Sequence, residues 1–120
     1  MEKTVTIDGK EITFKTNGAT PLRYKAQFGR DYFKEILKMA PLQNLSKKKK
    51  ENIVASDLEA LDFEVFYNIA WIMAKTADSS IPEPIEWLEQ FDEFPMIEII
   101  PELQDMLLVS MQTSKKNKYG

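Results

Sequence analysis

Residues 56–77, SDLEALDFEVFYNIAWIMAKTA, have the pattern of one long amphipathic helix. Ser56 followed by Glu59 matches a capping box, which predicts that the helix begins at Ser56. Helical spacing groups most apolar side chains into two adjacent stripes, so we expect this helix to form the centre of the core. Trp71 lies on the side of the narrow polar strip. The stripes consist of Leu58, Leu61, Val65, Ile69 and Ile72, and of Phe66, Ala70, Met73 and Ala77, and the polar strip consists of Glu64, Asn68 and Lys75.

A β-hairpin is predicted at the start of the chain. Residues 4–7 and 12–15 alternate apolar and polar side chains, and Asp8-Gly9 between them is typical of a hairpin turn. A four-residue loop over residues 8–11 places Val5 opposite Phe14, whereas a two-residue loop places Lys3 opposite Phe14. We favour the four-residue loop, because it groups all the apolar side chains on one face. A lone hairpin is marginal in water, so this face must cover a helical core or a partner.

Two shorter helices are expected next. The first begins at Thr20-Pro21, because threonine can cap free amides and proline fits the first helical position. It ends near Phe28, where Gly29 can adopt the left-handed conformation. The second is capped by Asp31 and stopped by Pro41. Its apolar residues are Tyr32, Phe33, Ile36, Leu37 and Met39, of which Phe33, Ile36 and Leu37 share one face.

The rest of the chain alternates breakers with short apolar patterns. Residues 42–55 contain four consecutive lysines and read as an exposed connection or a frayed helix start, and residues 78–84 read as a loop. A short acidic helix with Ile85, Trp87, Leu88 and Phe91 follows. Pro95 and Pro101 then precede a last helix over residues 102–112, with Leu103, Met106, Leu107 and Met111 on its main face.

Together these elements predict a mainly α fold: one small helical domain with an N-terminal β-hairpin, α+β by strict count. With 120 residues and 43% apolar content, the chain is long enough for one core. The domain spans residues 1–112, with the hairpin at 4–15, and residues 113–120 form a basic flexible tail. The absence of Cys and His excludes thiolate nucleophiles, zinc sites of those ligands and imidazole bases. Carboxylate pairs, Lys nucleophiles and magnesium held by carboxylates remain open, but Glu and Asp are too common to indicate them. We expect no enzyme, no cofactor and no metal site.

Charge is divided unevenly along the chain. Residues 1–50 hold 12 Lys and Arg against 5 acids, a balance of +7, whereas residues 76–114 hold 9 acids and no Lys or Arg, a balance of −9. Opposite charges on one chain can pair between copies, so we expect a salt-sensitive homo-oligomer. The start lacks a secretory signal pattern, and apolar runs such as residues 69–74 are too short to span a bilayer. These features favour a soluble cytoplasmic protein.

Candidate sites are of three kinds. The lysine run at 47–50 could contact nucleic acid, but no aromatic or Arg residue interleaves with it, so a solvated loop explains it better. The carboxylates of Glu83, Glu86, Glu89, Asp92 and Glu93 match no metal or catalytic spacing and fit a solvated helix face. Apolar residues near polar faces indicate either a partner surface or the edge of the core. The candidate partner-binding residues are Trp71, Trp87, Phe91, Phe94, Leu108 and Val109.

The chain contains TVTIDGKEITF at residues 4–14, ATPLRY at 19–24 and FGRDYF at 28–33, in this order. These segments resemble the opening of the tail assembly chaperones of siphophages and Gram-positive prophages. A looser similarity continues through the long aromatic helix and the acidic segment at residues 85–88. The specific part of the resemblance is the order of hairpin, Ala-Thr-Pro helix start and Phe-Gly-Arg-Asp.

The resemblance implies a non-enzymatic protein of the host cytoplasm that is absent from the finished virion and keeps the tape measure protein soluble during tail tube assembly. Further partners would be the tail tube protein and a longer form of the chain made by ribosomal frameshifting. Lys115-Lys116-Asn117 is compatible with a slippery heptamer, which the nucleotide sequence would test. No set of binding residues carries over from the family. A small DNA-associated phage regulator is the alternative, favoured by the basic first half and weakened by the net charge of −3 and the lack of a recognition helix.

Overall fold

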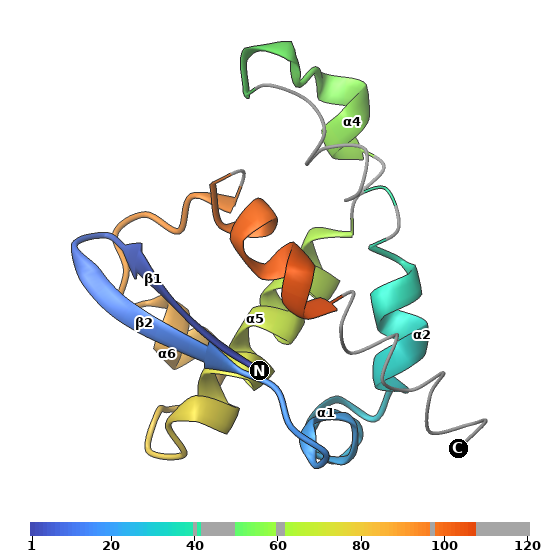
Figure 1. Cartoon of the computed structure of the whole chain (residues 1–120), viewed down its shortest axis with the longest axis vertical. Coiled ribbons are helices and arrows are strands. Elements are labelled where there is room, and N and C mark those ends of the chain that lie inside the picture. Colours follow the sequence, from blue (N-terminus) through green and yellow to red (C-terminus); the bar gives the residue numbers. More distant parts are fainter. Residues whose placement is uncertain (40, 42–49, 60–61, 97, 108–120) are drawn as a thin grey trace.

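The computed structural model describes residues 1–39, 41, 50–59, 62–96 and 98–107. It is a small, mainly α domain with an N-terminal β-hairpin, which confirms the predicted fold class. In chain order the elements are β1 (Glu2–Ile7), β2 (Lys10–Lys15), α1 (Thr20–Phe28), α2 (Tyr32–Leu37), the 3-10 helix η1 (Lys50–Asn52), α4 (Ala55–Glu59), α5 (Phe63–Ala77) and α6 (Pro84–Leu88). Residues 98–107 form a further helix, called here the C-terminal helix, which is orange to red in Figure 1.

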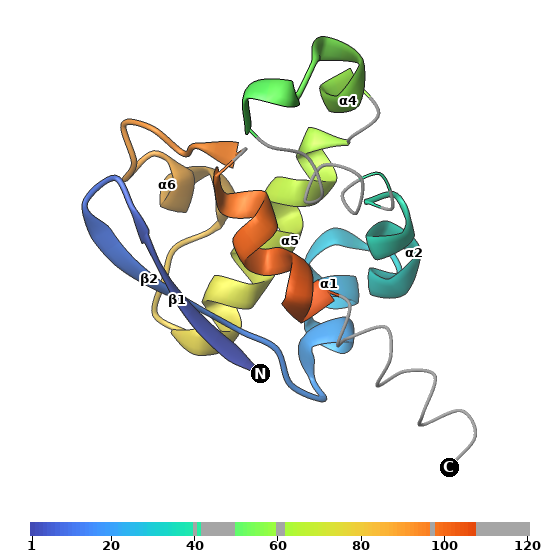
Figure 2. The ribbon, with the colours of Figure 1, turned by 45° about the horizontal axis from the view of Figure 1, so that its top comes forward.

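Helix α5 is the centre of the core, as predicted. Strand β2 packs along it, and α1 and α6 also contact it. Figure 2 shows the hairpin, the C-terminal helix and the α1–α2 pair arranged around α5, whereas α4 lies apart from this assembly. The enclosure explains why so much of α5 is buried. Its buried residues are Val65, Phe66, Ile69, Ala70, Trp71, Ile72, Met73 and Ala74.

The predicted helix over residues 56–77 is divided into α4 and α5, so the capping box at Ser56 is wrong. Ser56 lies inside α4. The cap of α5 is instead Asp62, which has extended backbone and accepts a hydrogen bond at Oδ1 from the Val65 amide (3.2 Å). An aspartate three residues before an apolar run satisfies a free amide at a helix start. The apolar pattern continues through Asp62, where a new helix begins, so periodicity alone could not show the boundary between α4 and α5.

The preferred hairpin register is also wrong, and the alternative two-residue loop is right. Val5 pairs with Ile12, and Lys3 pairs with Phe14. Asp8 and Gly9 have φ angles of 52° and 76°. Two central residues with positive φ are characteristic of a type I′ turn, whose twist matches that of the two strands. The apolar side chains still share one face, since Ile7 and Phe14 are fully buried and Val5 and Ile12 pack against the core.

The corner between α1 and α2 follows the sequence closely. Gly29 has a left-handed φ of 72° and its amide donates to the Lys25 carbonyl. Asp31 then caps α2 by accepting a hydrogen bond at Oδ1 from the Lys34 amide (3.0 Å). Both predictions are confirmed. The start of α1 differs, because Ala19 occupies the cap position and Thr20 Oγ1 accepts from the Asn17 amide (3.0 Å).

The inner face of α2 is rotated relative to the prediction. Tyr32 and Ile36 are buried and Phe33 is partly buried, but Leu37 is 58% exposed. The predicted shared face of Phe33, Ile36 and Leu37 is therefore wrong for Leu37. The helix turns Glu35 inward beside Ile36, so the residue after Ile36 points towards solvent.

The second half contains the predicted short acidic helix as α6. The C-terminal helix begins earlier than expected, so Pro101 lies inside it rather than before it. Its buried residues include the predicted Leu103, Met106 and Leu107. The predictions that lie outside the described residues are Leu61 of the first apolar stripe, the connection over residues 42–49, the end of the last helix at 108–112 and the basic tail at 113–120.

Candidate partner-binding surface

Trp71, one of the predicted partner-binding residues, lies in the core rather than on the surface. Its side chain is 2% exposed. The indole Nε1 donates a hydrogen bond to the Pro82 carbonyl (2.9 Å), and the ring meets Phe28 edge-on at a centroid distance of 5.8 Å. The loop after α5 thus covers the side of the helix that we expected to face solvent because Lys75 lies on it. Lys75 itself donates to the carbonyls of Ser79 and Ile81 and covers this loop from outside.

Trp87 and Phe91 also belong to the core. They are 2% and 7% exposed, and their rings contact each other at 5.3 Å. Phe94 is partly buried and joins them to α5, with centroid distances of 5.7 Å to Trp87 and 5.8 Å to Tyr67. These rings form one aromatic cluster that fastens α6 and the following segment to α5.

Of the two alternatives for these residues, a partner surface or the edge of the core, the burial of Trp71, Trp87 and Phe91 agrees with the core. A wheel for one helix cannot show how many neighbours will enclose it, and α5 is enclosed from several sides. Partner binding through the predicted set remains a prediction. Its other two members, Leu108 and Val109, lie outside the described residues. The five predicted surface carboxylates, from Glu83 to Glu93, are exposed as expected.

The structure exposes a different set of large apolar side chains. The two most exposed are Leu22 on α1 and Ile85 on α6, at 75% and 73%. Leu22 stands about 200° around the helix from the buried Tyr24, and Ile85 has the same relation to the buried Trp87. The predicted grouping of Ile85 with Trp87 is therefore wrong for Ile85, although the spacing of the two residues in the sequence already indicates opposite sides of the helix. The other exposed members are Met1, Leu37, Val54 and Phe63.

Helices α1 and α6 approach each other on one side of the molecule. Gln27 Nε2 at the end of α1 donates a hydrogen bond to Glu83 Oε2 at the start of α6 (3.2 Å). Beside this contact a shallow groove of about 240 Å³ runs between α1 and α5. Its lining residues are Arg23, Ala26, Gln27, Trp71, Ile72 and Lys75. We call this groove, together with Leu22 and Ile85, the α1–α6 surface.

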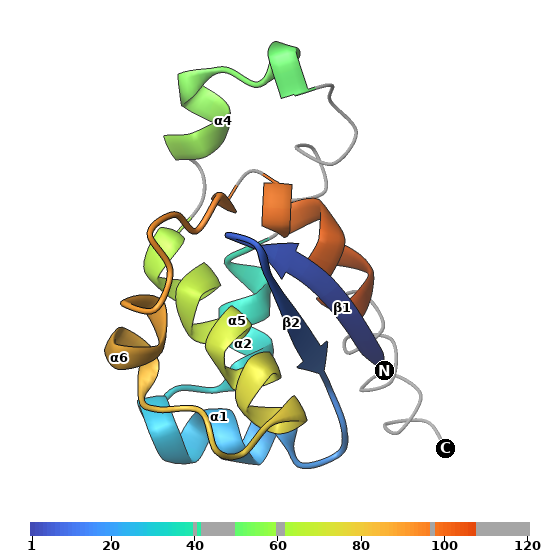
Figure 3. The same ribbon diagram turned by 90° about the vertical axis from the view of Figure 1, so that its left-hand side faces the viewer.

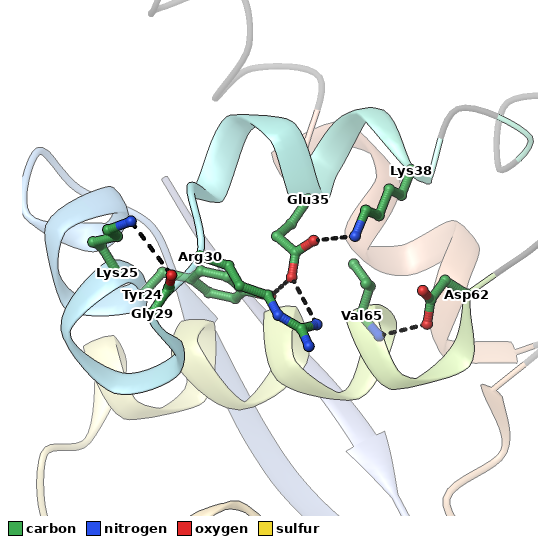
Figure 4. Close-up of polar contacts among 8 residues, drawn as sticks. All are labelled: Tyr24, Lys25, Gly29, Arg30, Glu35, Lys38, Asp62 and Val65. Carbon is green, nitrogen blue, oxygen red and sulfur yellow. Dashed lines mark hydrogen bonds and ion pairs between the residues drawn. The ribbon is translucent and has the colours of Figure 1, made fainter.

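A buried carboxylate lies on another side of α1. Figure 4 shows Glu35 of α2 pointing towards Tyr24, Arg30 and Lys38. Glu35 is 2% exposed; its Oε1 accepts from the Tyr24 hydroxyl at 3.1 Å, and its Oε2 lies 2.9 Å from Lys38 Nζ. Arg30 Nη1 lies 3.5 Å from Oε1. A buried charge requires such partners, so these contacts allow α2 to place an acid in the core.

The Tyr24 hydroxyl is held neutral in this environment. Burial raises the pKa of Tyr24 well above its usual range, and the nearby charge and hydrogen bond of Glu35 raise the pKa further. A side-chain hydrogen bond with Asn68 and the charge of Arg30 act in the opposite direction. The hydroxyl therefore acts as a hydrogen-bond donor to Glu35 rather than as an acid, and the contact fastens α1 to α2.

The described residues contain no group of three or more acidic side chains placed to hold a metal ion. None of the helices within the described ranges has both the length and the apolar character needed to cross a membrane. In comparisons with known proteins, no family model, no curated protein and no solved structure matches the chain.

Proposed function

We propose that this chain is a phage tail assembly chaperone that binds the tape measure protein in the host cytoplasm, keeps it soluble while the tail tube assembles, and is absent from the mature virion. The observation that carries the proposal is the resemblance of residues 4–33 to the opening of that family. The alternative is a small DNA-associated regulator. A mobility-shift assay at physiological salt distinguishes the two, since the chaperone should not retard duplex DNA.

The α1–α6 surface supports the proposal. A chaperone for a helical protein needs exposed apolar groups that can cover apolar stripes of its client. Leu22 and Ile85 are large, apolar and about three-quarters exposed, and they belong to two helices joined by the Gln27–Glu83 hydrogen bond. Monomeric proteins can carry scattered apolar side chains, so the role of this pair has to be tested by substitution.

Co-expression with the tape measure protein is the direct test. We expect the full chain to raise the soluble fraction of that protein and to be recovered with it in a pull-down. Leu22→Asp and Ile85→Asp should each lower the recovery, because a charge would have to be desolvated at the contact. Leu37→Asp is the matched control, since Leu37 is also exposed, at 58%, but belongs to α2.

The outcomes separate the function from the surface. If the full chain leaves the tape measure protein insoluble, the chaperone function is wrong. If the full chain solubilises it and both aspartate variants do the same, the function stands and the α1–α6 surface is wrong. Light scattering at low and high salt tests the proposed homo-oligomer, whose mass should fall as salt screens the opposite charges.

A further inference from the structure

The hairpin register determines which backbone groups of β1 are available to a third strand. A two-residue turn makes Ile7 and Lys10 a hydrogen-bonded pair, and the pattern repeats every second residue, at Val5 and again at Lys3. The N–H and C=O groups of Thr4 and Thr6 therefore point away from β2. Within the described ranges, no backbone hydrogen bond is formed by either residue on that side.

The two ends of the hairpin are fastened to the segment before the C-terminal helix and to that helix. At the turn, Lys10 Nζ donates to the Gln90 carbonyl, and Asp8 Oδ2 accepts from the Asp92 amide (3.0 Å). At the other end, Lys3 Nζ lies 2.8 Å from Glu102 Oε2. The hairpin is thus held at both of its ends, whereas the outer edge of β1 between them forms no backbone hydrogen bond within the described residues.

A groove of about 310 Å³ lies along this unpaired edge. One wall is β1, at Thr4 to Thr6, and the other is the turn and C-terminal helix from Pro95 to Glu102. Figure 3 shows this arrangement, with β1 between β2 and the orange-red C-terminal helix. A strand edge facing a helix across a groove can accept an extended peptide, because the edge supplies main-chain hydrogen bonds and the helix supplies side-chain contacts.

The charge of the groove selects its occupant. Two of its lining side chains are the acids Glu98 and Glu102. None of the residues that line the groove is Lys or Arg, and Lys3 of β1 pairs with Glu102 at one end of it. Electrostatic complementarity therefore favours a segment with positive side chains and disfavours an acidic one.

We propose that the outer edge of β1 binds an extended peptide segment of a partner protein, bearing Lys or Arg, as a third strand of the sheet. The backbone of Thr4 and Thr6 pairs with the segment, and Glu98 and Glu102 contact its positive side chains. This inference does not rest on the proposed function, because it concerns a different surface from α1–α6.

Fluorescence anisotropy with defined peptides tests the proposal. The probe is a labelled seven-residue peptide of alternating lysine and valine, compared with the same peptide with glutamate in place of lysine and with one whose central valine is proline. We expect the lysine peptide to bind at least tenfold more tightly than either of the others. The glutamate peptide loses the charge complementarity, and the proline peptide loses a main-chain hydrogen bond.

Proline substitutions in the protein provide a matched pair. Thr6 and Glu11 face each other as a non-hydrogen-bonded pair, so the N–H group of each points away from the other strand. Thr6→Pro therefore removes an N–H group from the outer edge of β1, and Glu11→Pro removes an N–H group from the outer edge of β2. Thr6→Pro should weaken binding of the lysine peptide by about tenfold, as expected for one hydrogen bond, whereas Glu11→Pro should leave it unchanged. Glu98→Gln should also weaken it, with Glu86→Gln on α6 as the control. Circular dichroism confirms that each variant folds.

Three results would overturn the proposal. The first is equal binding of the lysine and proline-interrupted peptides, which would mean charge attraction without strand pairing. The second is equal loss in Thr6→Pro and Glu11→Pro. The third is a dimer that dissociates only in Thr6→Pro, which would mean that a second copy of the chain occupies the edge.

Discussion

Replacing Tyr24 by phenylalanine removes one hydroxyl from the buried contact between α1 and α2. Tyr24 is fully buried, and its hydroxyl donates to Glu35 Oε1 at 3.1 Å. Hydrogen bonds to charged groups contribute about 1.5–3 kcal/mol. Because Glu35 keeps its contacts with Lys38 and Arg30, we expect a cost near the lower half of this range, about 2 kcal/mol at pH 7. Urea unfolding followed by tryptophan fluorescence measures this difference.

The same variant should change the dependence of stability on pH. The folded protein holds the pKa of Tyr24 above its ordinary value of 10.0. Below pH 10 the hydroxyl is neutral in both the folded and the unfolded chain, so its stabilisation is fully present. Above pH 10 the unfolded chain loses this proton first, and stability falls by about 1.4 kcal/mol per pH unit. The phenylalanine variant lacks this loss.

The cost of Tyr24→Phe should therefore shrink by about 1.4 kcal/mol between pH 7 and pH 11. Titration of the lysines affects both proteins and cancels in the difference. A cost below about 0.5 kcal/mol at pH 7 would refute the stabilising hydrogen bond. A cost that stays constant up to pH 11 would refute the raised pKa of Tyr24.

Two further predictions concern stability. Trp87→Ala should lower the free energy of unfolding by about 3–5 kcal/mol, because the ring is 2% exposed. Ile85→Ala on the same helix should change the free energy of unfolding by less than about 0.5 kcal/mol. Similar costs for the two variants would contradict the orientation of α6. Asp62→Ala should cost about 1 kcal/mol by removing the cap on the Val65 amide, and Ser56→Ala should be neutral. Urea unfolding measures both pairs, and a larger cost for Ser56→Ala would restore the capping box.

The parts of the fold that the sequence predicts well are those determined by one residue and its close neighbours. A left-handed helix end requires little more than glycine at the right position, and Gly29 occurs there. An aspartate cap requires only a free amide three residues later, as Asp31 and Lys34 provide. Local chemistry of this kind does not depend on the rest of the chain.

The hairpin register shows why other parts could not be predicted. Both registers place the same apolar residues on the same face, so alternation cannot distinguish them. The observed register puts Lys3 and Lys10 at the two ends of that face, which looks unfavourable in the sequence. Each lysine finds a partner far along the chain, at Glu102 and at the Gln90 carbonyl, so only the tertiary structure explains why they are tolerated.

The candidate site was harder still to predict, because exposure depends on how many elements surround a helix. Trp71 stands beside the polar Lys75 on a helical wheel, yet the loop after α5 covers it and its Nε1 bonds to Pro82. Leu22 belongs to a short helix with only one buried stripe, so its position opposite Tyr24 is enough to expose it. A wheel thus fails on the enclosed α5, and it also misplaced Leu37 on α2, where the inward Glu35 rotates the buried face.

The residues that carry the family resemblance have structural roles that the geometry accounts for. In the Phe-Gly-Arg-Asp segment, Gly29 ends α1, Asp31 caps α2, and Arg30 lies beside the buried Glu35. These residues form the corner that holds α1 against α2. A substitution there would affect folding as well as any binding, so it cannot test the proposed function by itself. Exposed positions such as Leu22 and Ile85 can, because a charge at a solvent-facing position should alter recognition of a partner while leaving the core intact.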